Sequence, residues 1–485
     1  MKKISELAAA IPGGAHVIGD GSGEISALCA DSRAVVPGAL FFCIRGARQD
    51  AHEFAPQAMN RGAACLCVER ELDVDCVQIV VKDVRAAQSY MAAEFFGRPA
   101  DKLTLIGITG TKGKSTTAFI VKAILEQAGI RAGLIGTICS MIADKQLPAG
   151  LTTPDPIEFQ GLLRQMVDAG VTHVVMEVSA HAIAQMRLEG VQFKVCGFSN
   201  LSQDHLDFFG TMEAYMLAKM RLFVAERCGA AVFNRDDDVV ARHFAGVTLK
   251  KFSFGIRELS EMYAKDVEVR DYGYEFKLTM NKQYTIDVQL HLQGIFNVYN
   301  AMLAAALCTT LGIGPEAIEK GIKAIRNVPG RVEVLETDTP YKVILDYAHS
   351  PAALGEVVKT IREGCKGRLI LLFGCGGDRD RDKRPQMGEI AGRTADYTIL
   401  TSDNPRSEDP HAILKQIEEG IKRTEGKYIV IEDRRAAIAH GLTIAKPGDV
   451  LVLAGKGHET YQEIKGTRHP FDEKVVVADL LKEMK

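Results

Sequence analysis

Hydrophobic positions along the chain follow two alternating patterns. Short, continuous apolar runs are separated by stretches in which apolar residues recur every three or four positions. The first pattern predicts buried strands, and the second predicts helices that bury one face. Strands that alternate with helices form mostly parallel sheets with helices on both faces, so we predict an α/β protein.

The predicted strands fall into three blocks, which we interpret as domains over residues 1–100, 101–330 and 331–485. Residues 264–292 alternate with period two instead, which predicts an antiparallel patch. The predicted strands are 39–44, 65–68 and 77–81 in the first block, 103–109, 132–136, 173–178, 194–198 and 230–233 in the second, and 343–347, 369–374, 397–403, 428–433 and 450–455 in the third.

Polar or glycine-rich segments follow at least four of the five strands predicted in the C-terminal block. They include DYAHSP after the first strand, GCGGDRDRDKRP after the second, SDNPRSEDP after the third and GKGHE after the last. Ligands of open α/β sheets bind outside the carboxyl ends of the strands. We therefore expect a ligand site in this block.

Composition narrows the class of protein. The formal net charge of −3 argues against a general nucleic-acid-binding protein. The 11 cysteines include no CxxC pair, which favours buried free thiols, and the apolar setting of Cys65 and Cys67 argues against zinc there. No apolar run reaches the roughly 18 residues that a membrane span needs. We expect a monomeric, cytoplasmic protein without a signal peptide.

A glycine loop joins a predicted strand to a predicted helix at the start of the central block. Backbone N–H groups at such a junction can hold phosphate oxygens, a lysine can reach the terminal phosphates, and a hydroxyl can bind Mg²⁺. The alternative, a tight turn without a ligand, is disfavoured by the flanking elements. The candidate phosphate-binding residues are Gly110, Thr111, Lys112, Gly113, Lys114, Ser115 and Thr116.

Two residues separate Gly110 from Gly113, where the usual phosphate loop has four. This short loop resembles that of the Mur ligases, the ATP-dependent amide synthetases that build peptidoglycan precursors. Other elements similar to that family follow in order over about 450 residues: TTP at 152–154, EVS at 177–179, NLS at 200–202, DHLD at 204–207, YxxAK at 215–219, NxxN at 297–300, GR at 330–331 and DYAHSP at 346–351.

The resemblance implies a three-domain fold: a central P-loop ATPase-type domain with a mostly parallel sheet, a C-terminal Rossmann-like domain and a smaller N-terminal α/β domain. It also implies an ATP- and Mg²⁺-dependent ligase, which adds an amino acid to the D-Glu γ-carboxylate of UDP-N-acetylmuramoyl-L-alanyl-D-glutamate through an acyl phosphate. Asn297, Arg331 and Asp346 are then expected to bind the nucleotide, with Asp346 on the ribose hydroxyls.

Glu177 and His205 both follow apolar runs, which predicts that they lie at strand ends near the glycine loop. A lone histidine such as His205 is more often a capping or core residue. In the family, residues that match Ser115, Glu177 and His205 hold the metal ions. Lys219 reads as an ordinary helix lysine, but resemblance to the YxxAK box implies a carbamylated lysine that helps to bind a second Mg²⁺. Together with Lys114, these residues form the expected catalytic set.

The resemblance assigns the UDP-sugar substrate to the first two blocks. Ser32 and the loop at 45–49 follow predicted strands and could hold pyrophosphate and uracil, although an ordinary surface turn is an equal alternative from the residues alone. Leu151 stands where the family often has asparagine. Residues that match muramoyl-dipeptide contacts are Thr152, Thr153, Ser179, Gln185 and Arg187.

The amino acid to be added is predicted from the DNPR segment. Read alone, it is a turn with a proline, but Arg406 could pair with a carboxylate in bidentate fashion. The segment resembles that of relatives that add meso-diaminopimelate, so Glu459 would suit the distal ammonium. The alternatives are L-lysine as substrate, a polyglutamate-type ligase on the same core, and a non-catalytic nucleotide-binding scaffold. The expected diaminopimelate residues are Arg379, Asp403, Asn404, Pro405, Arg406, Gly455 and Glu459.

Overall fold

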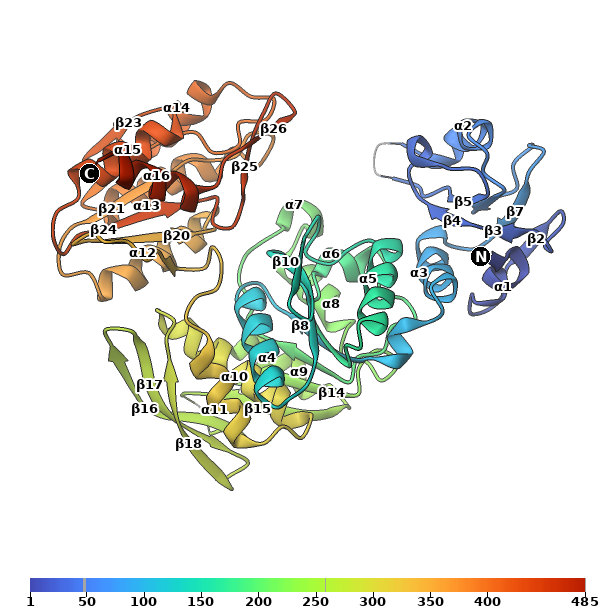
Figure 1. Ribbon diagram of the computed structural model, residues 1–485, viewed down its shortest axis with the longest axis horizontal. Helices are drawn as coiled ribbons and strands as arrows, with labels where there is room; N and C mark the ends of the chain where they lie inside the picture. Colours follow the sequence, from blue (N-terminus) through green and yellow to red (C-terminus); the bar gives the residue numbers. More distant parts are fainter. Residues whose placement is uncertain (47–48, 258, 485) are drawn as a thin grey trace. The chain divides into compact units, whose positions relative to one another are not determined.

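The computed structural model describes residues 1–46, 49–257 and 259–484 (Figure 1). Contacts between Cα atoms divide the chain into two compact units. The first comprises Met1–Ala264, Leu278–Ile286 and Asn300–Gly321, and the second comprises Lys265–Lys277, Asp287–Tyr299 and Ile322–Lys485. Each unit is described by itself.

The N-terminal part of the first unit is built on a five-stranded sheet, of order β2-β7-β6-β5-β4, in which β2 alone is antiparallel to its neighbour among the described residues. Alternate residues of β5 and β6 pack into two separate cores, one on each face of the sheet. Cys65 and Cys67 share one of those faces, and both thiols are free and buried, as expected.

The elements of this part are β1 (Lys2–Lys3), α1 (Ile4–Ala9), β2 (His16–Ile18), β3 (Glu24–Ile25), β4 (Ala27–Cys29), η1 (Ser32–Ala34), β5 (Ala39–Phe42), η2 (Ala51–Phe54), α2 (Ala55–Asn60), β6 (Cys65–Val68), β7 (Val77–Val80), α3 (Val84–Phe95) and η3 (Pro99–Lys102).

The central sheet has eleven strands in the order β11-β10-β9-β12-β8-β13-β14-β15-β16-β17-β18. Its middle, from β9 to β16, is parallel, and β10 and β11 form an antiparallel hairpin at one edge. The parallel strands β9, β12, β8, β13 and β14 are buried on both faces, which explains their continuous apolar runs. The five strands predicted here are confirmed to within one residue at either end, whereas the hairpin was not predicted.

The elements around this sheet are β8 (Thr104–Thr109), α4 (Lys114–Gln127), β9 (Ala132–Ile135), β10 (Cys139–Ile142), β11 (Lys145–Pro148), α5 (Pro156–Asp168), β12 (His173–Glu177), α6 (Ala180–Ala184), β13 (Val195–Phe198), α7 (Leu206–Phe209), α8 (Met212–Met220), β14 (Ala230–Asn234), α9 (Asp238–Ala245), β15 (Lys250–Gly255), β16 (Met262–Arg270), β17 (Gly273–Met280), β18 (Tyr284–Leu290), α10 (Ile295–Thr310) and α11 (Pro315–Ala324).

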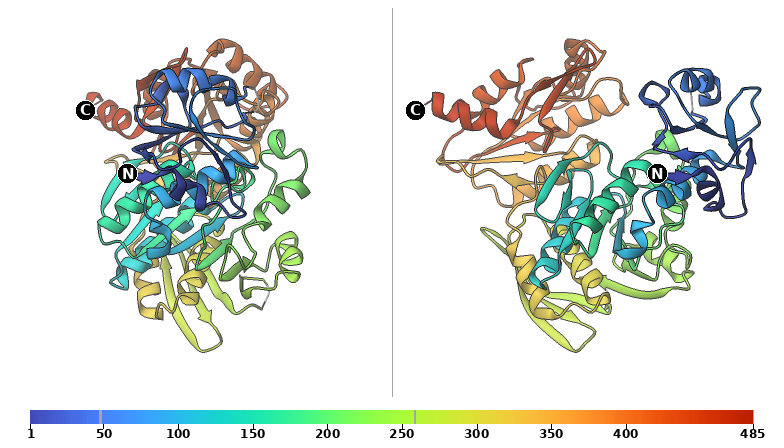
Figure 2. Two further views of the ribbon diagram at one scale, coloured as in Figure 1. Left: turned by 90° about the vertical axis from the view of Figure 1, so that its right-hand side faces the viewer. Right: turned by 45° about the vertical axis from the view of Figure 1, so that its right-hand side comes forward.

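The C-terminal sheet, in the second unit, has six strands in the order β19-β20-β24-β21-β22-β23, and all pairs except β19–β20 are parallel. Along β21, Leu369, Leu371 and Phe373 enter one core, while Ile370 and Leu372 enter the core on the opposite face. Helices therefore cover both faces, as Figure 2 shows and as the continuous apolar runs predict.

The elements of this part are β19 (Glu333–Val334), β20 (Lys342–Asp346), α12 (Pro351–Glu363), β21 (Leu369–Phe373), α13 (Lys383–Thr394), β22 (Tyr397–Leu400), α14 (Pro410–Ile421), β23 (Tyr428–Val430), α15 (Arg434–Ile444), β24 (Val450–Ala454), β25 (Tyr461–Ile464), β26 (Thr467–Pro470) and α16 (Glu473–Glu483).

Candidate active site

The glycine loop lies between β8 and α4, as predicted. Gly110 and Gly113 have φ values of +134° and +84°, which favour glycine. A Cβ at Gly110 would overlap the hydroxyl of Ser199, and one at Gly113 would overlap the side-chain oxygen of Asn300. Both glycines are thus required by backbone conformation and by close neighbours, and Ser115 and Thr116 are buried in the first turn of α4.

Residues that follow β13 fix the shape of this loop. Asn200 accepts hydrogen bonds from Thr111 N through its main-chain oxygen, at 2.8 Å, and from Lys112 N through Oδ1, at 3.0 Å. The hydroxyl of Ser199 donates to the main-chain oxygen of Lys112 at 2.7 Å. These three bonds fix the conformation of the glycine loop.

Two lysines converge on the carbonyl of Gly110. Lys114 Nζ donates to it at 3.1 Å and to Thr111 O at 2.8 Å, and Lys219 Nζ, from α8, donates to it at 2.8 Å. Lys219 is 1% exposed. Burial and the nearby Lys114 ammonium lower the pKa of the Lys219 amine well below its usual value. Sequence alone presents Lys219 as a solvated helix lysine, but the structure places it in the interior beside the phosphate loop.

Glu177 is the last residue of β12, as predicted, and pairs in register with Ile108 of β8. This register places the backbone of Glu177 beside Ile108, two residues before the glycine loop begins. Thr137 donates to both carboxylate oxygens, through N at 2.9 Å and through Oγ1 at 3.0 Å. Glu177 is 2% exposed.

The prediction for His205 was wrong in its local setting. β13 ends at Phe198, and His205 lies seven residues later as the cap of the short helix α7, with a φ of +54°. Its ring stands edge-on to that of His181, with centroids 4.7 Å apart, and 6.1 Å from the ring of Tyr215. The hydroxyl of Tyr215 in turn lies 3.5 Å from Thr111 Oγ1 in the glycine loop. His205 therefore still lies near this loop, with Tyr215 between them.

The residues predicted to contact the muramoyl-dipeptide form one hydrogen-bonded cluster that includes the main-chain oxygen of Glu177. Thr153 Oγ1 donates to Glu177 O at 2.8 Å and accepts from Ser179 N at 3.0 Å. Arg187 donates to Thr153 O at 2.8 Å and to the side chain of Gln185 at 2.7 Å. Thr152 joins the same cluster through the hydroxyl of Thr137, at 3.0 Å.

Ser32 borders a cavity of about 320 Å³ beyond the carboxyl ends of β4 and β5. It is buried and donates to Gln57 Oε1 at 2.8 Å. Residues 47 and 48 of the predicted 45–49 loop lie outside the described residues. The cavity is lined by both apolar side chains and polar groups, a combination that small-molecule pockets use. Its lining residues are Ala30, Ser32, Phe41, Ile44, Gly46, Gln49, Ala51 and Phe54.

In the second unit, Asp346 shapes the segment that follows Gly330. Its two carboxylate oxygens accept from Val332 N and Ala348 N, each at 2.7 Å, and it is 5% exposed. The guanidinium of Arg331 lies 5.0 Å from the ring centroid of Tyr347. Asn297 is buried, and its side-chain amide donates to Gln293 O at 2.7 Å. The structure brings Arg331 and Asp346 together.

The amino-acid residues predicted in the second unit meet at the ends of β21, β22 and β24. Asn404 donates to Glu459 Oε2 at 2.8 Å and accepts from Lys456 Nζ at 3.1 Å. Lys456 is fully buried and also donates to Glu459 Oε2 at 3.0 Å. A resident ammonium therefore already contacts the carboxylate that we expect to receive a substrate ammonium. Gly455 approaches Asp403 so closely that a Cβ would lie 2.6 Å from its carboxylate.

Arg406 lies on the same loop, with its Nη1 donating to Gly377 O at 2.7 Å. Arg379 is exposed, and its Nη1 donates to Asp378 O at 3.2 Å. A Cβ at Gly376 would lie 2.9 Å from Arg406 Nη1 and 3.9 Å from Arg379 Cγ. Pro405 packs against the backbone of Gly377, so the DNPR and GGDRD loops form one surface with two guanidinium groups.

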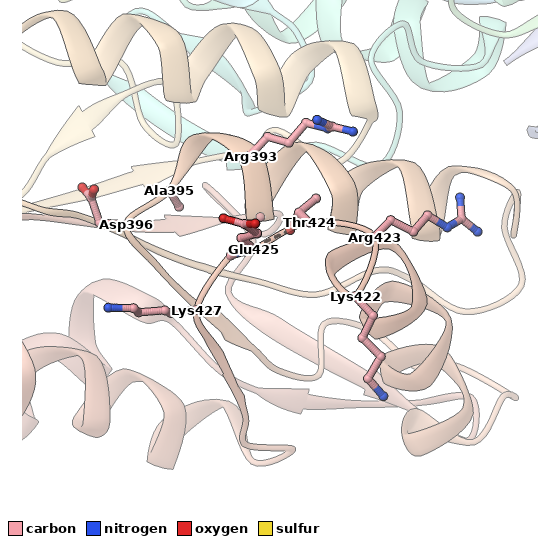
Figure 3. Close-up of a pocket in the computed structure, with 10 residues that line it drawn as sticks. Arg393, Ala395, Asp396, Lys422, Arg423, Thr424, Glu425 and Lys427 are labelled. Atoms are coloured by element: carbon pink, nitrogen blue, oxygen red, sulfur yellow. Dashed lines mark hydrogen bonds between the residues drawn. The ribbon is translucent and has the colours of Figure 1, made fainter.

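A larger cavity of about 790 Å³ lies elsewhere in the second unit, between the end of α13 and the connection from α14 to β23. Figure 3 shows that its basic side chains, Arg393, Lys422, Arg423 and Lys427, point in different directions. It includes none of the predicted site residues, and no convergent polar groups give it the features of a binding site.

The residues that the structure describes contain no cluster of three or more His, Cys, Asp or Glu side chains arranged to hold a metal ion. Within 1–46, 49–257 and 259–484, no helix has both the length and the apolar character of a membrane span.

Models of three Mur ligase domains match the chain. The Mur ligase family catalytic domain matches residues 24–94, the Mur ligase middle domain 108–308, and the Mur ligase glutamate ligase domain 330–457. A relative from Geobacillus thermodenitrificans, UDP-N-acetylmuramoyl-L-alanyl-D-glutamate–2,6-diaminopimelate ligase, is 42% identical over 99% of both chains.

The chain belongs to the Mur ligase family.

Solved structures agree with this membership, and the protein has the three-domain Mur ligase fold. A structure of a UDP-N-acetylmuramoyl-L-alanyl-D-glutamate–2,6-diaminopimelate ligase superposes with a TM-score of 0.69 at 32% identity, over 100% of this chain and 99% of that one. A folylpolyglutamate synthase from Mycobacterium tuberculosis, complexed with ADP and AMPPCP, superposes with a TM-score of 0.63 at 18% identity, over 82% and 95%. The second likeness is one of fold alone.

Several residues that organise this Mur ligase site were not predicted from its sequence. Asn200 shapes the phosphate loop, Thr137 holds Glu177, and Lys456 joins Asn404 to Glu459. Lys456 lies in the GKGHE segment and Asn200 in the NLS segment, so their positions in these motifs could have indicated a role in the site. Thr137 carries no such signal, because its partner is distant in the sequence.

Proposed function

We propose that this Mur ligase joins meso-diaminopimelate to the D-Glu γ-carboxylate of UDP-N-acetylmuramoyl-L-alanyl-D-glutamate, with ATP converted to ADP and phosphate. The observation that carries the proposal is the 42% identity, over 99% of both chains, to a relative that bears the name of this activity. Arg379 and Arg406, on two adjoining loops, support the choice of amino acid, because diaminopimelate has a distal carboxylate and lysine does not.

The reaction has two chemical steps. A γ-carboxylate oxygen of the dipeptide attacks the γ-phosphorus of ATP, and the bond to ADP breaks to give an acyl phosphate. The amine of diaminopimelate then attacks the acyl carbon, loses a proton, and phosphate leaves. A carboxylate resists amines until its oxygen becomes a good leaving group, which explains the need for ATP. Positioning and charge neutralisation do most of the work in phosphoryl transfer.

Phosphate binding falls to the loop from Gly110 to Thr116. The N-terminus of α4 is proposed to face a phosphate, and Lys114 to exchange its two carbonyl partners for phosphate oxygens. Asn297, Arg331 and Asp346 are proposed to bind the rest of the nucleotide.

Mg²⁺ fits the donors beside this loop, where it would neutralise phosphate charge. A buried carboxylate and a buried hydroxyl, from Glu177 and Ser115, are the hard oxygen ligands that Mg²⁺ prefers. We propose these two residues and His205 as its holders. A readout that does not depend on turnover is the binding of Mn²⁺, followed by electron paramagnetic resonance, which Glu177→Gln should weaken.

Lys219 is proposed to carry a carbamate. A neutral amine attacks CO₂ to form an N–C bond and releases one proton, and the lowered pKa of Lys219 makes the neutral form available. The product is an anion beside Lys114, which relieves the repulsion between two ammonium groups. Native mass measurement after exposure to ¹³C-labelled CO₂ tests this. An unmodified Lys219 in fully active protein would contradict it.

The remaining contacts follow from the clusters already described. Thr152, Thr153, Ser179, Gln185 and Arg187 are proposed to hold the muramoyl-dipeptide, and Ser32 the UDP end. We propose domain boundaries near residues 100 and 331, and a monomer, which size-exclusion chromatography with light scattering would test. Asp403, Asn404, Pro405, Gly455 and Glu459 complete the proposed diaminopimelate set with the two arginines.

Phosphate release measured with UDP-N-acetylmuramoyl-L-alanyl-D-glutamate and one amino acid at a time tests the whole proposal. We expect release with meso-diaminopimelate and far less with L-lysine, because an arginine without a carboxylate partner disfavours lysine. Equal rates with both would overturn the amino-acid assignment. Release with a folate and glutamate in place of these substrates would favour a polyglutamate-type ligase, and no release with any of them would end the ligase proposal.

A further inference from the structure

A hairpin that the sequence did not predict runs along the DNPR loop. β25 and β26 pair from Tyr461 with Pro470 to Ile464 with Thr467. One strand of this hairpin and the turn after it bond to three residues of the loop, Asp403, Asn404 and Arg406. The bonds are Gln462 Nε2 to Asp403 O at 2.7 Å, Glu463 N to Asn404 Oδ1 at 2.9 Å, Arg406 N to Glu463 O at 3.0 Å, and Lys465 N to Arg406 O at 2.7 Å.

The hairpin holds Arg406 in an unfavourable backbone conformation. The φ of Arg406 is +52°, in the left-handed region that is unfavourable for a residue with a Cβ. Its N–H and its carbonyl are both engaged by the hairpin, through Glu463 and Lys465. The direction in which the Arg406 side chain leaves the loop is therefore set by β25.

The guanidinium of Arg406 is also held at two points. Nη1 donates to Gly377 O at 2.7 Å, and Nε lies 3.5 Å from Glu463 Oε2. The two side chains are 19% and 24% exposed. The ion pair lies on the Nε side of the guanidinium, and the bond to Gly377 O uses one hydrogen of Nη1. A carboxylate bound at the outer edge would use the remaining hydrogens of Nη1 and Nη2 in a two-point bond.

We propose that Glu463 is a positioning residue, which orients Arg406 toward the distal carboxylate of the amino acid and thereby sets the preference for diaminopimelate over lysine. This inference rests on the proposed function. A carboxylate that fixes a guanidinium from the side lowers the ordering cost of binding the second carboxylate. Lysine has no group at that position, so its use does not depend on Glu463.

Steady-state kinetics with both amino acids tests the role of Glu463. For Glu463→Ala we expect the KM for diaminopimelate to rise about tenfold, with kcat within about twofold and kcat/KM for lysine unchanged. Glu463→Gln keeps an acceptor for Nε–H and should restore most of the lost affinity. Glu419→Ala, which removes the same group from an exposed position on α14, serves as the matched control and should behave as the wild type.

Three results would overturn the assignment. An unchanged or lower KM for diaminopimelate in Glu463→Ala would mean that Glu463 does not orient Arg406 or competes with the substrate. A parallel loss with diaminopimelate and lysine would show a general structural role. Wild-type protein that fails to use diaminopimelate would remove the proposed function itself, and this inference with it, so the two failures are distinguished by the wild-type measurement.

Discussion

The phosphate loop and the amino-acid pocket are built in different ways. The loop is a run of consecutive residues between β8 and α4, and its proposed ligand groups lie within that run. The proposed amino-acid site gathers short segments that follow β21, β22 and β24, together with β25, and its proposed ligand groups are mostly side chains. The shape of the loop therefore depends on its glycines, whereas the amino-acid site depends on ion pairs that align its side chains.

Lys114→Met probes the loop at the lysine that donates to Gly110 O and Thr111 O, and it has the largest expected effect. Loss of the ammonium should lower kcat by about 10²–10³-fold, because charge on the transferred phosphoryl group is no longer neutralised. Phosphate release measures it. Lys320→Met, at an exposed position on α11, should leave kcat unchanged. A loss of less than tenfold in Lys114→Met would contradict the role of this lysine.

Arg406→Met probes the pocket. We expect kcat/KM for diaminopimelate to fall about 10²-fold, since a charge-assisted pair with the distal carboxylate is lost, and kcat/KM for lysine to stay constant. Competition assays with the two amino acids report the ratio directly. Arg423→Met, in the lining of the larger cavity, is the control. An equal loss of activity in this variant would mean that diaminopimelate does not bind at Arg406 as proposed.

A pair of glycine substitutions separates backbone strain from contact in the loop. Gly113 and Gly129 both have positive φ, but a Cβ at Gly113 overlaps Asn300, whereas one at Gly129 has no neighbour within 4 Å. Gly129→Ala should cost about 1 kcal/mol of unfolding free energy, and Gly113→Ala about 1–3 kcal/mol more. Urea unfolding compares them. Equal costs would show that Asn300 moves aside freely.

The smallest expected effect concerns an ion pair beneath the pocket. The fully buried Arg384 guanidinium holds the pKa of Glu408 at about 2, below the ordinary 4.5. A folded-state pKa that is lowered stabilises the protein above pH 4.5, and that stabilisation is lost as the pH falls from 4.5 toward 2. The stability gap between wild type and Glu408→Gln, about 1–3 kcal/mol at pH 7, should therefore shrink at pH 3.5. A gap that does not change with pH counts against this pair.

The sequence predicted the strands that are continuous apolar runs between polar segments, in all three larger sheets. It did not predict β2, β4 and β19, which are two or three residues long, or β15, which begins with two exposed lysines. It also located the glycine loop, since the strand, loop and helix are contiguous. It did not predict the β10–β11 and β25–β26 hairpins, because β11, β25 and β26 are largely polar or exposed and the buried strand β10 is only four residues long. His205 was misplaced for a related reason, because the distance between a strand end and the next helix cannot be read from periodicity.

What the sequence determined by itself is therefore the architecture and the chemistry that lies within one segment: an α/β chain, a phosphate loop and an arginine after a strand. Tertiary structure decided which polar or oppositely charged group lies beside each charged side chain. It buried Lys219 against Gly110, placed Lys456 on Glu459, and put Glu463 beside Arg406. These pairs join residues of different segments, and their effect depends on burial and on angstrom-scale distance, neither of which hydrophobic periodicity encodes.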